Sequence, residues 1–216
     1  MYKNFLKRVF DFIIALIALP FVLLVIIIIA PIIYINDPGP VFYNATRYGK
    51  NGKIFKMFKF RSMYVNSPDL RNADGTTFNG ENDPRVTKVG RFMRKTSVDE
   101  IPQFLNMLLG HVSLIGPRPT LATIPYDELT EQQKKRYNVR PGITGYSQAY
   151  YRNSIGGDEK LEYDCYYVDN ISFVLDVKII FQTVLSVLGR KNIYVAAEEP
   201  VKEPAAEVKV EETVNQ

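Results

Sequence analysis

Two adjacent carboxylates, Asp99 and Glu100, are the residues of this sequence best suited to chemistry. They stand in the stretch KTSVDEIPQFLN, directly after three basic residues, Arg91, Arg94 and Lys95. A carboxylate at the start of a helix meets the positive end of the helix dipole, which favours its ionised form and also favours a bound phosphate nearby. An ionised aspartate can act as a nucleophile, so the pair is a candidate catalytic centre.

The same pair also fits a purely structural role. Ser97-x-x-Glu100 matches a capping box, in which the Ser and Glu side chains exchange hydrogen bonds with backbone donors at a helix start. Pro102 argues against this, because with Ser97 as the cap the proline would clash with the carbonyl four residues before it. With Asp99 as the cap, the proline would lie where no donor is needed. Capping and catalysis both stay open on the pattern alone.

Two rigid basic segments could supply phosphate contacts. They are GPRP at residues 116–119 and RPGITG at residues 140–145. Prolines fix the backbone around Arg118 and Arg140, and a pre-positioned guanidinium recognises phosphate oxygens in a bidentate way at reduced entropic cost. For either segment taken alone, a turn whose arginine faces water is the simpler interpretation.

Several familiar signatures are absent from the sequence, which narrows the chemistry. It contains no GxxxxGK[ST], HExxH, CxxC or GxSxG motif and no Asp-x-Asp. The single histidine, His111, lies between Gly110 and Val112, a setting more typical of a surface or helix-end residue than of a catalyst. Cys165 is the single cysteine, so no intrachain disulfide can form and a cytosolic catalytic body fits.

An uncharged apolar segment at residues 12–35 predicts insertion into a bilayer. Its length exceeds the roughly 20 residues that a helix needs to cross hydrocarbon. It also exceeds a signal-peptide core, so we expect it to remain in the mature protein. Both flanks are basic: Lys3, Lys7 and Arg8 precede it, and Arg47, Lys50, Lys53, Lys56, Lys59 and Arg61 follow it. The positive-inside rule then favours a re-entrant helix broken at Pro20, with both ends in the cytoplasm, over a single span with a proline kink.

The rest of the chain predicts a small hairpin and several helices. Residues 41–63 read as two strands joined at Asn51-Gly52, with Lys59 and Arg61 on one face of the second strand and Phe58 and Phe60 on the other. Residues 66–84 read as a surface loop. Helices are expected at residues 97–109, 128–137 and 172–189, the last as a core or interfacial helix.

Charge is distributed unevenly along the chain. The tail at residues 198–216 holds six glutamates against two lysines, a net charge of −4 that leaves +8 on the rest. The tail is too poor in large apolar groups to fold alone. The basic body suits phosphate-bearing partners, which include nucleic acid, anionic lipid headgroups and nucleotide substrates.

Taken together, the motifs KRVFDF, KIFKMFKFRSM, VGRFMRKTSVDEIPQFLNMLLGHVSLIGPRP, VRPGITG and DCYYVDN resemble those of the bacterial sugar transferase family, the monotopic phosphoglycosyltransferases. The resemblance covers residues 7–189. It implies an α+β, mostly helical fold with a re-entrant membrane helix in residues 1–36. A catalytic domain at residues 37–195, with interfacial amphipathic helices and the hairpin, would follow, and residues 196–216 would form a disordered acidic tail.

The resemblance also implies a reaction. A sugar 1-phosphate would pass from a UDP-sugar to polyprenyl (undecaprenyl) phosphate with release of UMP, in a ping-pong sequence with a covalent phosphosugar on Asp99. Glu100 would assist, and both carboxylates would hold Mg²⁺. The residues implied in phosphate or substrate binding are Lys59, Arg61, Arg94, Arg118, Arg140, Arg152 and Asn153.

By the same resemblance, the site would face the cytoplasm at the bacterial cytoplasmic membrane and start the assembly of a capsule, O-antigen, exopolysaccharide or protein-linked glycan. Expected partners are the bilayer, the UDP-sugar, the polyprenyl phosphate, downstream membrane glycosyltransferases and a second copy in a homodimer, with no nucleic acid. The chain departs from the family pattern at Leu19-Pro20, where relatives commonly have Ser-Pro, and at His111 and Tyr146-Ser147. A membrane scaffold without turnover is the alternative, which the intact Asp99-Glu100 pair disfavours.

Overall fold

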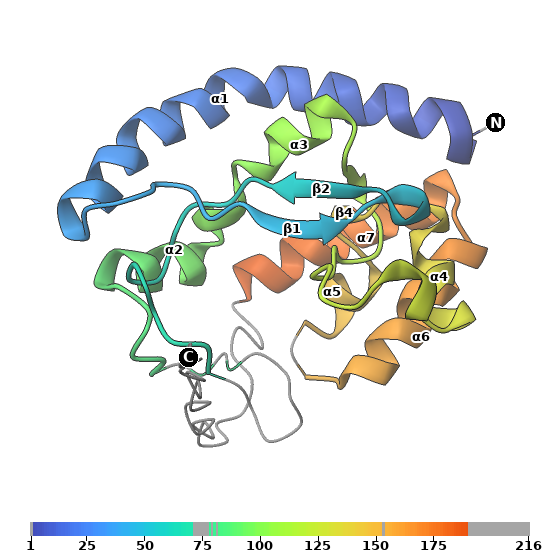
Figure 1. The fold of residues 1–216 in the computed structure, drawn as a ribbon. Coiled ribbons are helices and arrows are strands. Elements are labelled where there is room, and N and C mark those ends of the chain that lie inside the picture. Colours follow the sequence, from blue (N-terminus) through green and yellow to red (C-terminus); the bar gives the residue numbers. More distant parts are fainter. Residues whose placement is uncertain (1, 71–77, 79, 81, 153, 190–216) are drawn as a thin grey trace, which may run out of the picture.

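A computed structural model describes residues 2–70, 78, 80, 82–152 and 154–189 (Figure 1). The fold is α+β and mostly helical, as the sequence predicted. The helices are α1 (Lys7–Asn36), α2 (Lys88–Thr96), α3 (Gln103–Leu109), α4 (Glu131–Lys135), α5 (Tyr146–Tyr150), α6 (Gly157–Asp169) and α7 (Phe173–Leu188). The strands are β1 (Ala45–Tyr48), β2 (Ile54–Met57), β3 (Ser113–Ile115) and β4 (Gly142–Thr144). The predicted tail at residues 196–216 lies outside the described residues.

Helix α1 is long and apolar enough to cross a membrane, and only 11% of its most apolar window is buried against the rest of the protein. Figure 1 shows it arching over β2 and α3. The helix continues through Pro20 and Pro31, so the break expected at Pro20 is wrong. A proline deletes one backbone hydrogen bond, and a long helix absorbs that loss by curving. The exposed apolar surface of α1 is consistent with membrane association.

Polar contacts join the first turns of α1 to the body. The Arg8 guanidinium donates to the carbonyls of Met107 (2.8 Å) and Leu108 (3.0 Å) at the end of α3. The Met107 carbonyl also accepts the Gly110 amide at the helix C-cap, and the negative end of the helix dipole favours a cation beside both carbonyls. One turn later, the buried Asp11 carboxylate accepts a hydrogen bond from the Leu114 amide at 2.9 Å. The KRVFDF motif therefore fixes α1 on α3 and β3.

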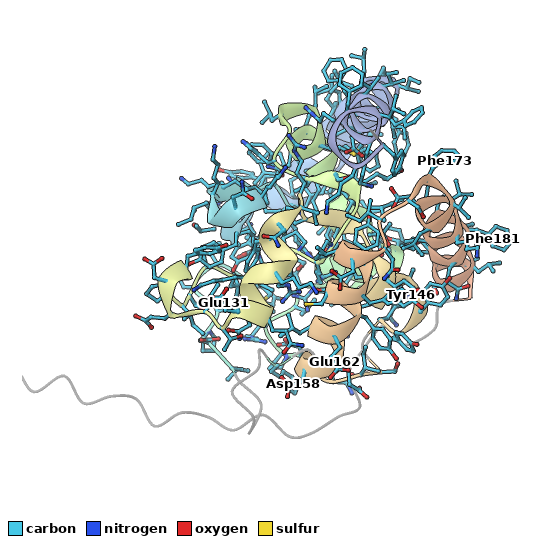
Figure 2. The ribbon with its side chains drawn as sticks, turned by 90° about the vertical axis from the view of Figure 1, so that its right-hand side faces the viewer. Glu131, Tyr146, Asp158, Glu162, Phe173 and Phe181 are labelled. Carbon is cyan, nitrogen blue, oxygen red and sulfur yellow. The ribbon has the colours of Figure 1, made fainter. Side chains whose placement is uncertain are left out.

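A buried carboxylate on α7 contacts the residues at the start of α1. Asp176 is 3% exposed and accepts hydrogen bonds from the hydroxyls of Tyr2 (2.5 Å) and Tyr167 (2.7 Å). It also pairs with the Lys7 ammonium at 2.5 Å. Helix α7 matches the predicted 172–189 helix, and its outer face is apolar and exposed. In Figure 2, Phe173 and Phe181 point outward from this helix.

The predicted hairpin is confirmed. Strands β1 and β2 pair antiparallel from Ala45↔Met57 to Tyr48↔Ile54, and Asn51 in the connecting turn has φ +57°. Strand β2 ends before Lys59, but the pairing continues as an isolated bridge between Phe42 and Phe60. The predicted alternation holds at its centre, because Phe60 is fully buried while Lys59 points to the opposite side.

Strands β3 and β4 form a parallel pair that the sequence did not predict. Ser113 pairs with Gly142 and Ile115 with Thr144, which brings the GPRP and RPGITG segments side by side. A Cβ at Gly142 would lie 2.1 Å from the Gly116 nitrogen, so only glycine permits this approach. The two rigid segments are therefore one structural unit.

Other expectations need correction. The helix predicted at 128–137 is reduced to α4 with short 3₁₀ turns at Tyr126–Glu128 and Arg136–Asn138. The surface loop predicted at 66–84 is partly buried, because Asp83 is fully enclosed and pairs with Arg85 at 2.8 Å. Helix α6 was missed because its three tyrosines and five acidic residues form no clear apolar stripe.

Gly90 on α2 gives a stability prediction. An added Cβ would lie 1.9 Å from the Ser62 carbonyl oxygen, which accepts a hydrogen bond from the Thr87 amide at the start of the helix. We expect Gly90→Ala to destabilise the protein by about 2 kcal/mol, although alanine favours an isolated helix. Thermal unfolding in detergent measures this. Gly157→Ala is the matched control, since its Cβ would meet nothing within 4 Å; equal midpoints for the two variants would contradict the prediction.

Candidate active site

A sharp turn between α2 and α3 presents Asp99 and Glu100. Helix α2 ends at Thr96, and Ser97 takes the left-handed conformation with φ +58°. A 3₁₀ turn over Val98–Glu100 then leads into α3, which begins at Gln103 after Pro102. The helix predicted from residue 97 thus starts later, and the Ser97 side chain makes no capping hydrogen bond. The capping interpretation is wrong, and both carboxylates are left for other contacts.

Two cations contact these carboxylates. The Lys59 ammonium lies 2.9 Å from Asp99 Oδ2 and 3.2 Å from Glu100 Oε1. The Arg118 guanidinium lies 3.3 Å from the same Glu100 oxygen. The backbone joins the two segments as well, because the Phe60 amide donates to the Asp99 carbonyl at 3.0 Å. The hairpin, the α2–α3 turn and the GPRP segment therefore meet at one point.

Burial and charge shift the pKa values of the two carboxylates in opposite directions. Burial raises the pKa of Asp99, and although Lys59 and Arg94 lower it, the pKa stays above its ordinary value. Burial also raises the pKa of Glu100, but Lys59 and Arg118 outweigh it and bring that pKa to about 2. Burial would lower the pKa of Lys59, yet the two carboxylates raise it. The site therefore holds a protonated lysine, an ionised glutamate and a less acidic, enclosed aspartate.

Residues 2–190 match the sequence model of the family described as bacterial sugar transferase. The chain belongs to this family. It is 43% identical to the "Uncharacterized sugar transferase EpsL" of Bacillus subtilis (strain 168), over 87% of this chain and 90% of that protein. It is 41% identical to the "Exopolysaccharide production protein PSS" of Rhizobium leguminosarum bv. phaseoli, over 86% of this chain and 96% of that protein.

A longer relative is named for its reaction. The "UDP-glucose:undecaprenyl-phosphate glucose-1-phosphate transferase" of Escherichia coli (strain K12) is 41% identical over 89% of this chain, which spans 42% of that protein. The family and the enzyme class predicted from the motifs, a phosphoglycosyltransferase, are thereby confirmed.

Two further predicted residues of this sugar transferase lie beside the carboxylates. Arg94 donates from Nε to the Ser62 hydroxyl at 2.9 Å, and its charge acts on Asp99. Burial lowers the pKa of Arg152, while the charge of Glu100 opposes that effect. Arg152 has φ +51°, an uncommon conformation for a residue with a side chain. Together with Lys59 and Arg118, these arginines surround the pair with positive charge.

Other predicted residues lie elsewhere in the sugar transferase. Arg61 is 8% exposed and pairs with Asp37 at the end of α1, at 3.3 Å. Arg140 donates from Nε to the Gly110 carbonyl at 2.9 Å, so it binds the end of α3 opposite the carboxylates. Both arginines therefore have structural contacts within the protein, Arg61 with the end of α1 and Arg140 with the end of α3. Asn153 lies outside the described residues.

Sequence reasoning missed two cations of the site. Arg47 on β1 donates to the Pro119 carbonyl at 3.3 Å and is acted on by the charges of Arg118 and Glu100. Burial and the charge of Arg118 lower the pKa of Lys160 on α6. Arg47 stands in no proline-rich motif, and Lys160 stands in the acidic run Asp158–Glu162. The alternation of β1 was the available signal for Arg47, and α6 offered none for Lys160.

Proposed function

We propose that this enzyme transfers a sugar 1-phosphate from a UDP-sugar to polyprenyl phosphate and releases UMP. The observation that carries the proposal is the enclosed Asp99 carboxylate paired with Lys59 at 2.9 Å, with Arg118 at its partner Glu100. The reaction names of the relatives from Escherichia coli and Aeromonas hydrophila support the substrate class. Cations around a carboxylate suit a reaction in which a diphosphate approaches it.

The proposed chemistry has two displacements at one phosphorus atom. An Asp99 carboxylate oxygen bonds to the β-phosphorus of the UDP-sugar, the bond from that phosphorus to the bridging oxygen breaks, and UMP leaves. An oxygen of polyprenyl phosphate then bonds to the same phosphorus, the bond to Asp99 breaks, and the carboxylate is restored. Burial raises the pKa of Asp99, and the Lys59 charge offsets part of that rise, which favours the ionised nucleophile. The Arg118 side chain, 55% exposed, is accessible to phosphate oxygens.

The position of α1 suits this acceptor. Polyprenyl phosphate stays in the bilayer, so the nucleophile must lie near the headgroup plane. The apolar α1 is held to the end of α3 through Arg8, and Asp99 lies in the 3₁₀ turn before α3. We propose a location at the cytoplasmic face of the cytoplasmic membrane, where the product would pass to membrane glycosyltransferases that extend the glycan.

We also propose Mg²⁺ as the cofactor. Among the described residues no group of three or more His, Cys, Asp or Glu could hold a metal. Two adjacent carboxylates nevertheless fit Mg²⁺, which commonly binds one or two carboxylates together with substrate phosphates and water. Glu100 is the better donor because its pKa of about 2 keeps it ionised. Asp99 would add a second oxygen, and the bound ion would neutralise charge on the diphosphate.

Removal of divalent cations gives a direct prediction. We expect EDTA treatment to abolish UMP release, because Lys59 and Arg118 are already paired with Asp99 and Glu100, and the proposed ion would neutralise the charge of the diphosphate. Adding Mg²⁺ in excess over the chelator should restore the rate, whereas adding K⁺ at equal ionic strength should not. Full activity in EDTA would contradict the proposed cofactor.

UMP release from a panel of UDP-sugars tests the proposed function. The purified protein, in detergent or nanodiscs, is assayed with and without a short polyprenyl phosphate. We expect continuous release with the acceptor, for one or a few sugars. Without the acceptor we expect one UMP per active site, because a ping-pong enzyme completes its first half-reaction alone. A scaffold would release none in either case, and a single-displacement enzyme would release UMP only with the acceptor.

A further inference from the structure

A cavity lies next to the GPRP segment. It has a volume of about 130 Å³ and lies between the end of β1, the segment after Pro119 and helix α4 with its following turn. Its lining residues are Tyr48, Thr120, Leu121, Thr123, Ile124, Leu129, Gln133, Arg136 and Tyr137. None of these residues belongs to the set predicted from the sequence motifs. The cavity contains neither Asp99 nor Glu100 in its lining.

Arg118 links this cavity to the carboxylate pair. Its guanidinium contacts Glu100 at 3.3 Å, while its backbone carbonyl accepts a hydrogen bond from Arg136, which lines the cavity. Thr120, two residues further along the chain, lines the cavity as well. Two residues of extended chain span at most about 7 Å. A ligand whose phosphates lie at Arg118 therefore has the cavity within reach of its next group.

The cavity walls are aromatic and aliphatic. The buried rings of Tyr48 and Tyr137 lie with centroids 5.4 Å apart, and Leu129 is buried beside them. The Thr120 and Tyr137 hydroxyls already bond each other at 2.5 Å. Walls of this kind favour a flat, unsaturated ring. A hexose would bury several hydroxyl groups, and mainly aromatic and aliphatic walls supply fewer hydrogen-bond partners than these groups need.

Unused hydrogen-bond donors complete the cavity. Arg136 Nε is buried and has no hydrogen-bond partner among the described residues, while the rest of that guanidinium binds Asp164. Gln133 uses its carbonyl oxygen to accept the Thr130 amide at 2.9 Å. Its NH₂ group has no protein partner in the part of the chain that the structure describes. The site therefore offers donors to a ligand that carries acceptors.

We propose that this cavity binds the uracil ring of the UDP-sugar, an inference that rests on the proposed function. A volume of about 130 Å³ is large enough for a single planar ring. The two carbonyl oxygens of uracil are acceptors for the Gln133 and Arg136 donors. The base, the diphosphate and the nucleophile would then lie along one line through Arg118.

Gln133→Glu is the sharpest test, because it replaces an NH₂ donor in the cavity wall with a carboxylate acceptor and keeps the fold. Glutamate serves as well as glutamine at this position of the Thr130 capping box. Its carboxylate, however, would face a carbonyl of the base. We expect the KM for the UDP-sugar and the Kd for UMP, measured by calorimetry, to rise about tenfold, with kcat within twofold of wild type. Gln132→Glu, the same charge change at an exposed neighbour, should change neither constant.

Thr120→Val provides a second, neutral variant of the same wall. It removes a hydroxyl bonded to Tyr137 and should weaken UMP binding about threefold or more. Unchanged UMP affinity in both variants would overturn the inference. So would altered sugar selectivity with unchanged UMP affinity, because the cavity would then hold the sugar. If the proposed function itself were wrong, the result would be distinguishable, because the wild-type protein would release no UMP from any UDP-sugar.

Discussion

Asp99→Asn is expected to lower the rate of UMP release by at least about 10³-fold, the largest effect of any single substitution in this protein. The amide has the size of the carboxylate, so the Val98–Glu100 turn and its backbone bond from Phe60 should persist. The neutral side chain, however, cannot form the bond to phosphorus that the first displacement requires. Loss of activity without loss of fold would show that the Asp99 carboxylate is required for the reaction.

Covalent labelling measures this directly. A UDP-sugar carrying radioactive phosphorus at the β-position, supplied with Mg²⁺ and without acceptor, should label the wild-type protein and leave Asp99→Asn unlabelled. Asp158→Asn is the matched control, because Asp158 is exposed in the first turn of α6 and lies at the edge of the molecule opposite α1 (Figure 2). Label on Asp99→Asn equal to that on wild type would refute the assignment.

Lys59→Met is expected to lower kcat/KM by about 10²-fold and to change its pH dependence. Lys59 lowers the pKa of Asp99, so its loss raises that pKa further. A nucleophile must be deprotonated, and activity falls as pH drops through its pKa. The acid limb of the kcat/KM profile should therefore move to higher pH in Lys59→Met.

A rate–pH profile across the acidic range checks this expectation. Lys56→Met is the control, because the Lys56 side chain is exposed on β2 and has no ion pair among the described residues. An acid limb that stays at the wild-type position in Lys59→Met would mean that another group limits the rate at low pH.

Glu100 and Asp99 also make the stability of the fold depend on pH. The pKa of Glu100 falls from 4.5 to about 2 in the folded protein. A lowered pKa stabilises the fold above the unfolded value, and this contribution is lost as pH falls from about 4.5 through about 2. The raised pKa of Asp99 acts with the opposite sign. Lys59→Met should therefore reduce the pH-dependent contribution of Glu100 to the free energy of unfolding.

Local signals in the sequence were sufficient for the hairpin, α7 and the carboxylate pair. Asn51-Gly52 predicted the hairpin because Asn and Gly accept positive φ. Ser172 marked the start of α7, where its hydroxyl accepts the Leu175 amide at 3.2 Å. Strand alternation set Lys59 on the face opposite Phe60, and the family resemblance implied its role in phosphate binding.

Other features depend on contacts between distant segments. The parallel β3–β4 pair joins residues about 30 positions apart, and neither strand has an alternating pattern. The turn before α3 depends on a serine with positive φ, which composition does not predict. Motif membership also failed to separate Arg118, which reaches Glu100, from Arg140, which binds the end of α3.

The attachment of α1 to α3 has a mechanical consequence. Arg8 and Asp11 clamp α1 onto the end of α3 and onto β3, and α3 is joined at its other end to the turn that carries Asp99. With α1 in the bilayer as proposed, its depth among the lipids would set the height of the carboxylate above the acyl chains. The rate of the second displacement should therefore change with bilayer thickness, because α1 would set the distance between Asp99 and the lipid acceptor.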